Sequence, residues 1–114
     1  MDDAVRVYMR EMGKVPPLTR AQEAECVRHI RAKDEQADVA EKDLVEANLA
    51  LVVDIAKKHP SDRVHILDLI IVGNVALMQA VRVFADRGAG NFSSFAAVYI
   101  ERAIEHAAIT SQNC

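Results

Sequence analysis

The sequence is poor in aromatic residues, in turn-forming residues and in cysteine. Phe, Tyr and Trp make up 4% of its 114 residues, and Trp is absent, so a core must be built mainly from Ala, Val, Leu and Ile. Four Gly and three Pro provide too few turns for a many-stranded sandwich or barrel. Two cysteines, Cys26 and Cys114, cannot form a disulfide framework or a four-cysteine zinc site. These absences favour a few long helices.

A strong net charge and a long hydrophobic run are also missing. Fourteen Lys and Arg against 17 Asp and Glu give a formal net charge of −3, which gives no support to nucleic-acid binding. The acidic start, Met1-Asp2-Asp3, leads us to expect no signal peptide, and no apolar run approaches the roughly 20 residues that span a bilayer. Because 51% of the residues are hydrophobic, a core can still form. We expect a soluble, cytoplasmic, all-α domain without a membrane contact.

Helical spacing of apolar residues predicts three helices in the N-terminal half. The first covers residues 3–12, and Gly13 is predicted to end it in a left-handed conformation. The second begins with a capping box, Thr19 and Gln22, and ends near Lys33. The third is predicted as one long helix from about residue 35 to 58.

Two more helices are predicted in the C-terminal half. Pro60 and residues 61–63 form a turn before the apolar block 66–78, whose length favours helix over strand. Gly73 in that block costs about 1 kcal/mol relative to Ala, so it is predicted to permit a close helix contact. After the loop at residues 87–91, Ser93 or Ser94 is predicted to cap a last helix that ends near Ile109.

The motifs of common enzymes are absent. Gly88 and Gly90 lack the Lys-Ser/Thr pair of a phosphate-binding loop. The histidines are scattered without a second ligand at helical spacing, at positions 29, 59, 65 and 106. We therefore predict no catalytic residue, no metal site and no cofactor, and we expect the protein not to be an enzyme.

Three stretches resemble the bacterial sigma-70 family of RNA polymerase initiation factors, in the family's order. They are DAVRVYMREMGKVPPLTRAQE, LVEANLALVVDIAKKH and ILDLIIVGNVALMQAV; a fourth, VFADRGAGNFSSFAAVYIERAI, is similar more loosely. The resemblance implies a compact orthogonal bundle of about five helices. Residues 1–18 would form an N-terminal helix and Pro-rich turn that contacts downstream DNA. Residues 19–114 would bind the polymerase core and read the minus-ten promoter element.

The resemblance also implies a DNA-binding set for the unpaired non-template strand. Aromatic side chains replace lost base stacking at about 1–3 kcal/mol per base. Phe84 and Phe92 match the family's flipped-base pocket, and Phe95 matches the position on which that base stacks. The alternative is that the aromatic residues simply pack the core. The full set is Tyr8, Met9, Arg10, Asn48, Phe84, Arg87, Asn91, Phe92, Phe95, Tyr99 and Arg102.

A second implied set would bind the clamp helices of the bacterial RNA polymerase core. The family's D-L-I-Q-E-G-N is D-L-I-I-V-G-N here, so that Ile71 and Val72 replace two polar residues. An exposed apolar pair suits a different partner, such as an anti-sigma protein or a second copy in a homodimer, or it packs within the chain. The set is Leu67, Asp68, Ile71, Val72, Asn74 and Met78.

The last stretch departs from the family at the positions that would contact DNA. Val98 and Tyr99 stand where the family has paired tryptophans, and Glu101 and Glu105 replace an Arg and a Thr. Acidic residues repel phosphate, so promoter binding should be weak or should depend on a partner. Two interpretations stay open: a transcription initiation domain, or a sigma-like interaction module that no longer reads promoters.

Overall fold

The computed structural model describes residues 3–59 and 64–112, with side chains described up to Ile109. These residues form six α-helices and no strand. The all-α prediction is confirmed, with one helix more than expected. The helices are α1 (Asp3–Met12), α2 (Arg20–Ala32), α3 (Ala37–Glu46), α4 (Leu49–Lys57), α5 (Ile66–Arg87) and α6 (Phe92–Gln112).

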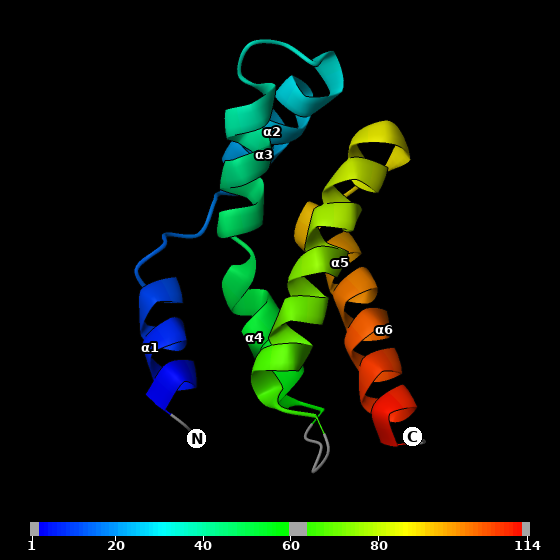
Figure 1. Cartoon of the computed structure of the whole chain (residues 1–114). Helices are drawn as coiled ribbons and strands as arrows, with labels where there is room; N and C mark the ends of the chain where they lie inside the picture. Colours follow the sequence, from blue (N-terminus) through cyan, green and yellow to red (C-terminus); the bar gives the residue numbers. More distant parts are fainter. Residues whose placement is uncertain (1–2, 60–63, 113–114) are drawn as a thin grey trace.

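Two helical hairpins and α4 build the bundle. Helices α5 and α6 run antiparallel side by side, while α2 and α3 form a second hairpin whose turn lies at the top of Figure 1. Helix α4 continues below α3 and packs on both α5 and α6. Helix α1 lies at the left edge and contacts α4. The α5–α6 loop therefore lies at the same end of the molecule as the α2–α3 hairpin.

Local signals place the start and end of α2 as predicted. The Thr19 hydroxyl accepts a hydrogen bond from the Gln22 amide (3.1 Å), and the Gln22 side chain accepts one from the Thr19 amide (2.9 Å). Lys33 follows α2 in a left-handed conformation with φ 52°. The predicted end of α1 at Gly13 is confirmed. The left-handed conformation predicted for Gly13 is wrong, because Gly90 and Lys33 are the positions with positive φ among the described residues.

The predicted long helix from residue 35 to 58 is also wrong, since the structure breaks it between α3 and α4. Asn48 lies at the break with φ −112° and ψ 6°. Its side-chain amide donates to the Leu44 carbonyl (2.8 Å). Asn competes in this way for backbone groups and favours helix ends. The break turns α4 toward the α5–α6 hairpin.

The cap of α6 differs from the prediction as well. Asn91, not Ser93 or Ser94, precedes the helix, and its side-chain oxygen accepts from the Ser94 amide (2.9 Å). An Asn at this position satisfies an amide that the helix leaves unpaired. The turn predicted at residues 60–63 lies outside the described residues.

Helix α5 is the centre of the core. Eight of its residues are buried, and it contacts α2, α3, α4 and α6. A Cβ added at Gly73 would lie 2.6 Å from Val52 Cγ1 and 3.0 Å from Ile104 Cδ1, which confirms the predicted close approach. By length and composition α5 could also cross a membrane, but a buried core helix meets the same test. Its packing explains its apolar character.

Candidate functional site

The four aromatic residues of the C-terminal half form one cluster where α5 ends and α6 begins. The ring centroid of Phe84 lies 5.3 Å from that of Phe92 and 5.1 Å from that of Phe95. The Phe95 and Tyr99 centroids are 5.1 Å apart, with the rings tilted by 32°. Phe92 and Phe84 are buried in the core, whereas Phe95 and Tyr99 are half-buried. Of these four residues, Phe95 and Tyr99 are therefore the ones on which a base could stack.

The first turn of α6 is held by side chains from α2 and from the break between α3 and α4. Glu23 of α2 accepts a hydrogen bond from the Phe92 amide (2.8 Å), and a carboxylate at a helix N-terminus is favoured by the helix dipole. The Ser93 hydroxyl lies 3.2 Å from Glu23 Oε2 and 3.0 Å from Asn48 Oδ1. Asn48 is only 6% exposed. Asn48 therefore fixes the start of the candidate DNA-reading helix rather than standing open to a strand.

The sequence did not predict Glu23 as a site residue, and it predicted Ser93 only as a possible helix cap. The Glu23 contacts span 69 and 70 residues of chain, and no local pattern points to them. Glu23 and Ser93 meet beside the predicted base-binding residues only because α2 packs next to the α5–α6 loop.

A cavity of about 610 Å³ opens beside this loop. Arg31 of α2 reaches across it and donates to the carbonyls of Phe84 (3.2 Å), Ala85 (2.9 Å) and Gly88 (2.6 Å). The Phe84 carbonyl also accepts a hydrogen bond from the Gly88 amide (2.8 Å). Arg31 adds a partner for the Ala85 carbonyl in the last turn of α5, where carbonyls lack an intrahelical partner. The cavity is lined by Arg20, Glu23, Ala24, Val27, Arg31, Phe84, Gly88, Ala89, Gly90 and Asn91.

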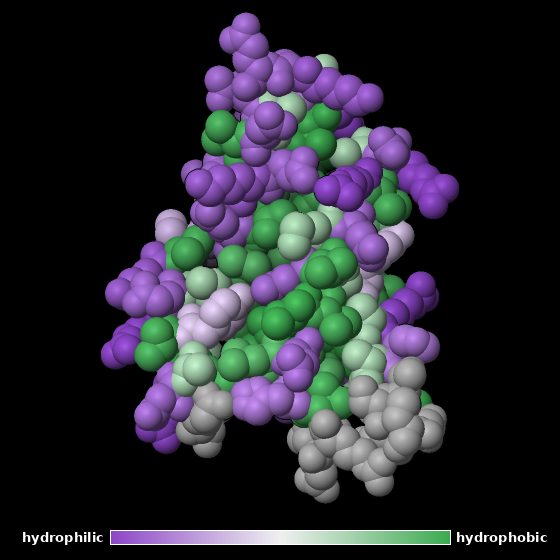
Figure 2. Space-filling view, viewed as in Figure 1, coloured by the Kyte–Doolittle hydropathy of each residue, from purple (hydrophilic) through white to green (hydrophobic). Residues whose placement is uncertain are grey.

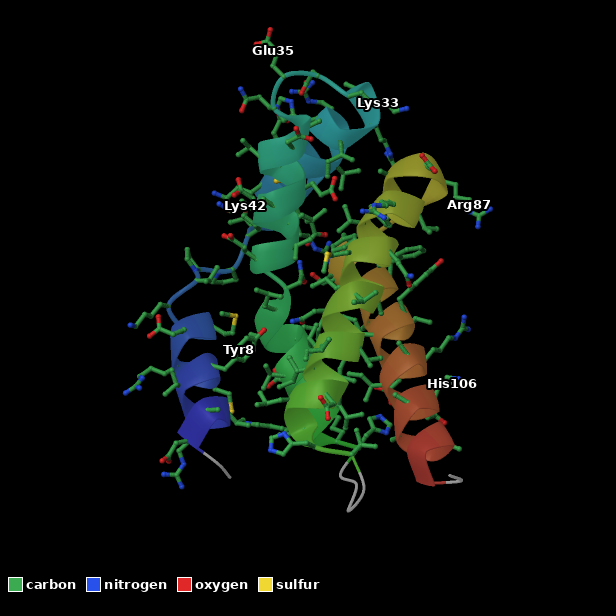
Figure 3. The ribbon with its side chains drawn as sticks, in the orientation of Figure 1. Tyr8, Lys33, Glu35, Lys42, Arg87 and His106 are labelled. Atoms are coloured by element: carbon green, nitrogen blue, oxygen red, sulfur yellow. The ribbon has the colours of Figure 1, made fainter. Side chains whose placement is uncertain are left out.

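The charged residues predicted to meet phosphate are spread along α5 and α6, and only Arg87 lies beside the α5–α6 loop. Arg87 is exposed at the end of α5 and points away from the helices (Figure 3). Arg102 is exposed on α6. Glu101 accepts a bond from the His59 ring, which joins α6 to the end of α4. Glu105 is exposed and takes no part in this contact.

The predicted N-terminal residues lie elsewhere, on α1. Tyr8 points toward α4 and α5 (Figure 3), and its hydroxyl accepts from Asn74 Nδ2 (3.3 Å). Tyr8 and Met9 are half-buried, and Arg10 is exposed. The structure does not bring these residues to the aromatic cluster. It joins Tyr8 instead to Asn74, a residue predicted to bind polymerase.

The predicted polymerase residues lie along α5. Asp68, Ile71 and Met78 are exposed, whereas Leu67, Val72 and Asn74 are half-buried. Ile71 is 60% exposed. Figure 2 shows hydrophobic residues gathered along the middle of this face, over α5. Of the two apolar residues that replace polar ones in the family motif, Ile71 is therefore exposed at the surface, and Val72 is half-buried.

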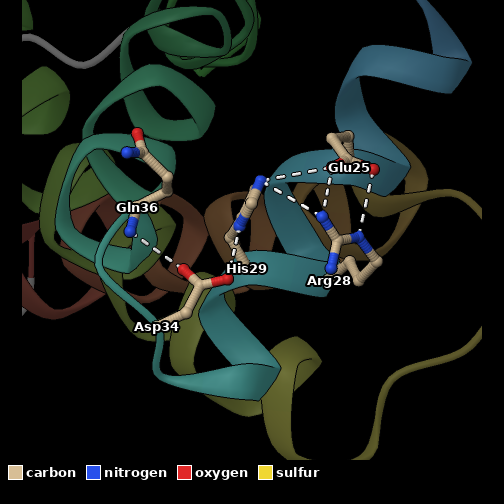
Figure 4. Close-up of polar contacts among 5 residues, drawn as sticks. All are labelled: Glu25, Arg28, His29, Asp34 and Gln36. Atoms are coloured by element: carbon tan, nitrogen blue, oxygen red, sulfur yellow. Dashed lines mark hydrogen bonds and ion pairs between the residues drawn. The ribbon is translucent and has the colours of Figure 1, made fainter.

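A polar cluster lies at the α2–α3 turn and contains Glu25, Arg28, His29, Asp34 and Gln36 (Figure 4). His29 Nδ1 lies 2.6 Å from Asp34 Oδ2, and its Nε2 lies 3.2 Å from Glu25. The hydrogen bond from His29 lowers the pKa of Asp34, and the bond from Arg28 lowers the pKa of Glu25. The backbone amide of Gln36 donates a hydrogen bond to Asp34 Oδ1 (2.9 Å). This cluster fixes the turn that leads into α3.

Comparisons with known proteins agree on one family. Residues 3–36 match the model for sigma-70 factor region 1.2, and residues 44–111 match that for sigma-70 region 2. The chain is 40% identical to RNA polymerase sigma factor SigA of Lactococcus lactis subsp. cremoris over 107 residues, which cover 94% of the chain and 29% of that protein.

Two further relatives give the same result. SigA of Clostridium acetobutylicum is 41% identical and SigA of a Bacillus species is 40% identical, each over 107 residues that cover 94% of the chain and 28% of the relative. The chain thus spans less than a third of the length of these relatives.

Proposed function

Because this chain belongs to the sigma-70 family, we propose that it acts in bacterial transcription initiation. In this proposal the aromatic cluster where α5 ends and α6 begins holds the unpaired non-template strand of the minus-ten promoter element. The exposed face of α5 docks on the clamp helices of the polymerase core. The observation that carries the proposal is the aromatic cluster, in which Phe95 and Tyr99 stay partly open to solvent above two buried rings.

The cluster suits a strand whose bases have lost their neighbours. An unpaired base gains about 1–3 kcal/mol by stacking on an aromatic ring. Phe95 and Tyr99 would supply that ring, while Phe84 and the fully buried Phe92 support them from below. The cavity beside the loop would take an extruded base, since such bases need an enclosed pocket.

The surrounding groups would position the backbone of the strand. Arg87 and Arg102 are exposed and can pair with phosphates. Asn91 and Asn48 would act through the first turn of α6, because both hold that turn in place. Glu105 opposes phosphate, so we expect weak binding in isolation and stronger binding when polymerase holds the DNA nearby.

The other surfaces would complete the contacts. Asp68, Ile71 and Met78 would form the exposed part of the polymerase contact, with Leu67 and Val72 at its edge. Asn74 would support this face through Tyr8. Arg10, with Tyr8 and Met9, would lie toward downstream DNA, which makes residues 1–18 a separate contact from residues 19–114.

The test is binding to a labelled single-stranded oligonucleotide with a minus-ten sequence, compared with a scrambled strand. Polymerase core is added to both at low salt. We expect the minus-ten strand to bind several times more tightly. Equal binding, or none in the presence of core, would refute the DNA part of the proposal.

A variant separates the polymerase part from the DNA part. Asp68→Arg should weaken co-purification with the core, whereas Asp54→Arg, an exposed acid on α4, should not. If both variants behave as the natural chain does, the α5 face is not the docking surface.

The exposed Ile71 favours a second candidate, an interaction module that no longer reads promoters. Its partner would be polymerase or an anti-sigma protein that contacts an apolar helix face. Changing Ile71 to Gln and Val72 to Glu should then abolish partner binding, and the oligonucleotide test should show no sequence preference. Unchanged binding by this double variant would eliminate the candidate.

A further inference from the structure

The exposed face of α5 carries a stripe at coiled-coil spacing. Ile71, Val75 and Met78 are 60%, 48% and 40% exposed, and they are separated by four and three residues. The same spacing continues to Asp68 on one side and Arg82 on the other, both exposed. A stripe with steps of three and four residues is the pattern along which two helices pack. We call these five residues the α5 stripe.

The α5 stripe is complementary to itself. Asp68 and Arg82 each lie seven residues from Val75, so opposite charges flank the apolar centre at equal distances of about 10 Å along the helix. Neither charge forms an ion pair within residues 3–59 and 64–109. An antiparallel copy would place each Asp68 beside the other copy's Arg82, and the apolar residues would meet between them.

We propose that a second copy of this chain covers the α5 stripe, as an antiparallel pair with its two-fold axis near Val75. The observation that selects a second copy over an unrelated partner is this symmetry of charge, because a two-fold interface must match a surface to itself. The order of charges also suits the dipole of α5, but the dipole does not account for three exposed apolar residues between them.

The pairing goes beyond the proposed function and does not depend on it. It would use Asp68, Ile71 and Met78, the side chains assigned above to polymerase. A paired chain would therefore be unable to dock, and pairing and docking would compete. One helix face is smaller than the roughly 1,600 Å² that stable complexes bury, so we expect reversible, micromolar pairing.

The test is sedimentation of the 114-residue chain alone, from micromolar to near-millimolar concentration, in low salt with a reducing agent. The natural chain should form dimers as concentration rises. Val75→Glu should abolish them, whereas Val39→Glu, at a comparably exposed valine on α3, should not. A monomer at every concentration, or a dimer sensitive to Val39→Glu and not to Val75→Glu, would overturn the proposal.

Charge exchange tests the antiparallel arrangement. Asp68→Arg alone and Arg82→Asp alone should each raise the dimer Kd by about tenfold, because each places like charges together. The double variant, and an equal mixture of the two single variants, should both restore dimers. Failure of both restorations would contradict the pairing of these two residues. Because no polymerase or DNA is present, the result is independent of the proposed function.

Discussion

The guanidinium of Arg31 lies 5.8 Å from the ring centre of Phe84, and its Nη2 donates a hydrogen bond to the Phe84 carbonyl. This contact joins α2 to the end of α5, 53 residues away along the chain. It holds the last turn of α5 and the start of the loop that carries Asn91. Helix α2 thus positions the aromatic cluster at the α5–α6 junction without supplying an aromatic residue to it.

Replacing Arg31 should loosen this end of the molecule. Arg31→Met removes donors to three carbonyls, which should reduce the free energy of unfolding by about 1 kcal/mol, since the contacts are largely exposed. Urea denaturation measures the change. Arg28→Met is the matched control, because Arg28 bonds residues of its own helix, and it should change the free energy of unfolding less than Arg31→Met does, since exposed ion pairs contribute little. Equal effects of the two variants would contradict the role given to Arg31.

Gly73→Ala should destabilise the protein although Ala favours helix. The added Cβ would lie 2.6 Å from Val52 Cγ1, and such overpacking costs about 1–3 kcal/mol. The gain in helix propensity is at most about 1 kcal/mol. Gln79→Ala, at an exposed position of α5, should change the urea midpoint little. A more stable Gly73→Ala variant would show that α4 and α6 can move away from α5 without cost.

The features that sequence predicted are those set by neighbouring residues. The Thr19 capping box, the end of α2 near Lys33 and the close contact at Gly73 follow from local chemistry and periodicity. The failures are those decided by distant partners. Asn48 breaks a helix that lacks Gly or Pro because Leu44 accepts its amide and Ser93 approaches its oxygen.

The candidate site divides in the same way. The aromatic residues gather as the sequence suggested. Phe92 is buried whereas Phe95 is half-buried, and helical periodicity did not predict this difference in exposure. Glu23 and Arg31 reach the α5–α6 loop from α2, and a helical pattern alone assigns both of them to a solvated face. Only the packing of α2 against α5 brings them to the site.

Stability should fall in acid through the α2–α3 turn. Since the folded pKa of Asp34 is lowered by its bond to His29, the stabilisation is complete above the ordinary value of about 3.9. It is lost as pH falls through the lower, folded pKa. Asp34→Asn should therefore flatten the decline in unfolding free energy below about pH 4, while Asp38→Asn should leave it. The same slope in Asp34→Asn and the natural chain would contradict this.

Removing a partly exposed ring should weaken DNA binding more than stability. Phe95→Leu keeps an apolar side chain in the core but removes the stacking surface, so affinity for the minus-ten strand should fall about fivefold or more. Ile109→Ala, at an exposed position about four turns further along α6, should leave affinity unchanged. Binding is read by fluorescence anisotropy, and thermal unfolding of each variant checks that it folds.

The central claim is that unpaired bases stack on Phe95 or Tyr99, and photocrosslinking tests it directly. A minus-ten strand with iodouracil in place of thymine is bound in the presence of polymerase core, irradiated and mapped by mass spectrometry. We predict crosslinks at Phe95 or Tyr99 that a scrambled strand does not give. Crosslinks confined to other residues, or equal yields from the two strands, would contradict the account.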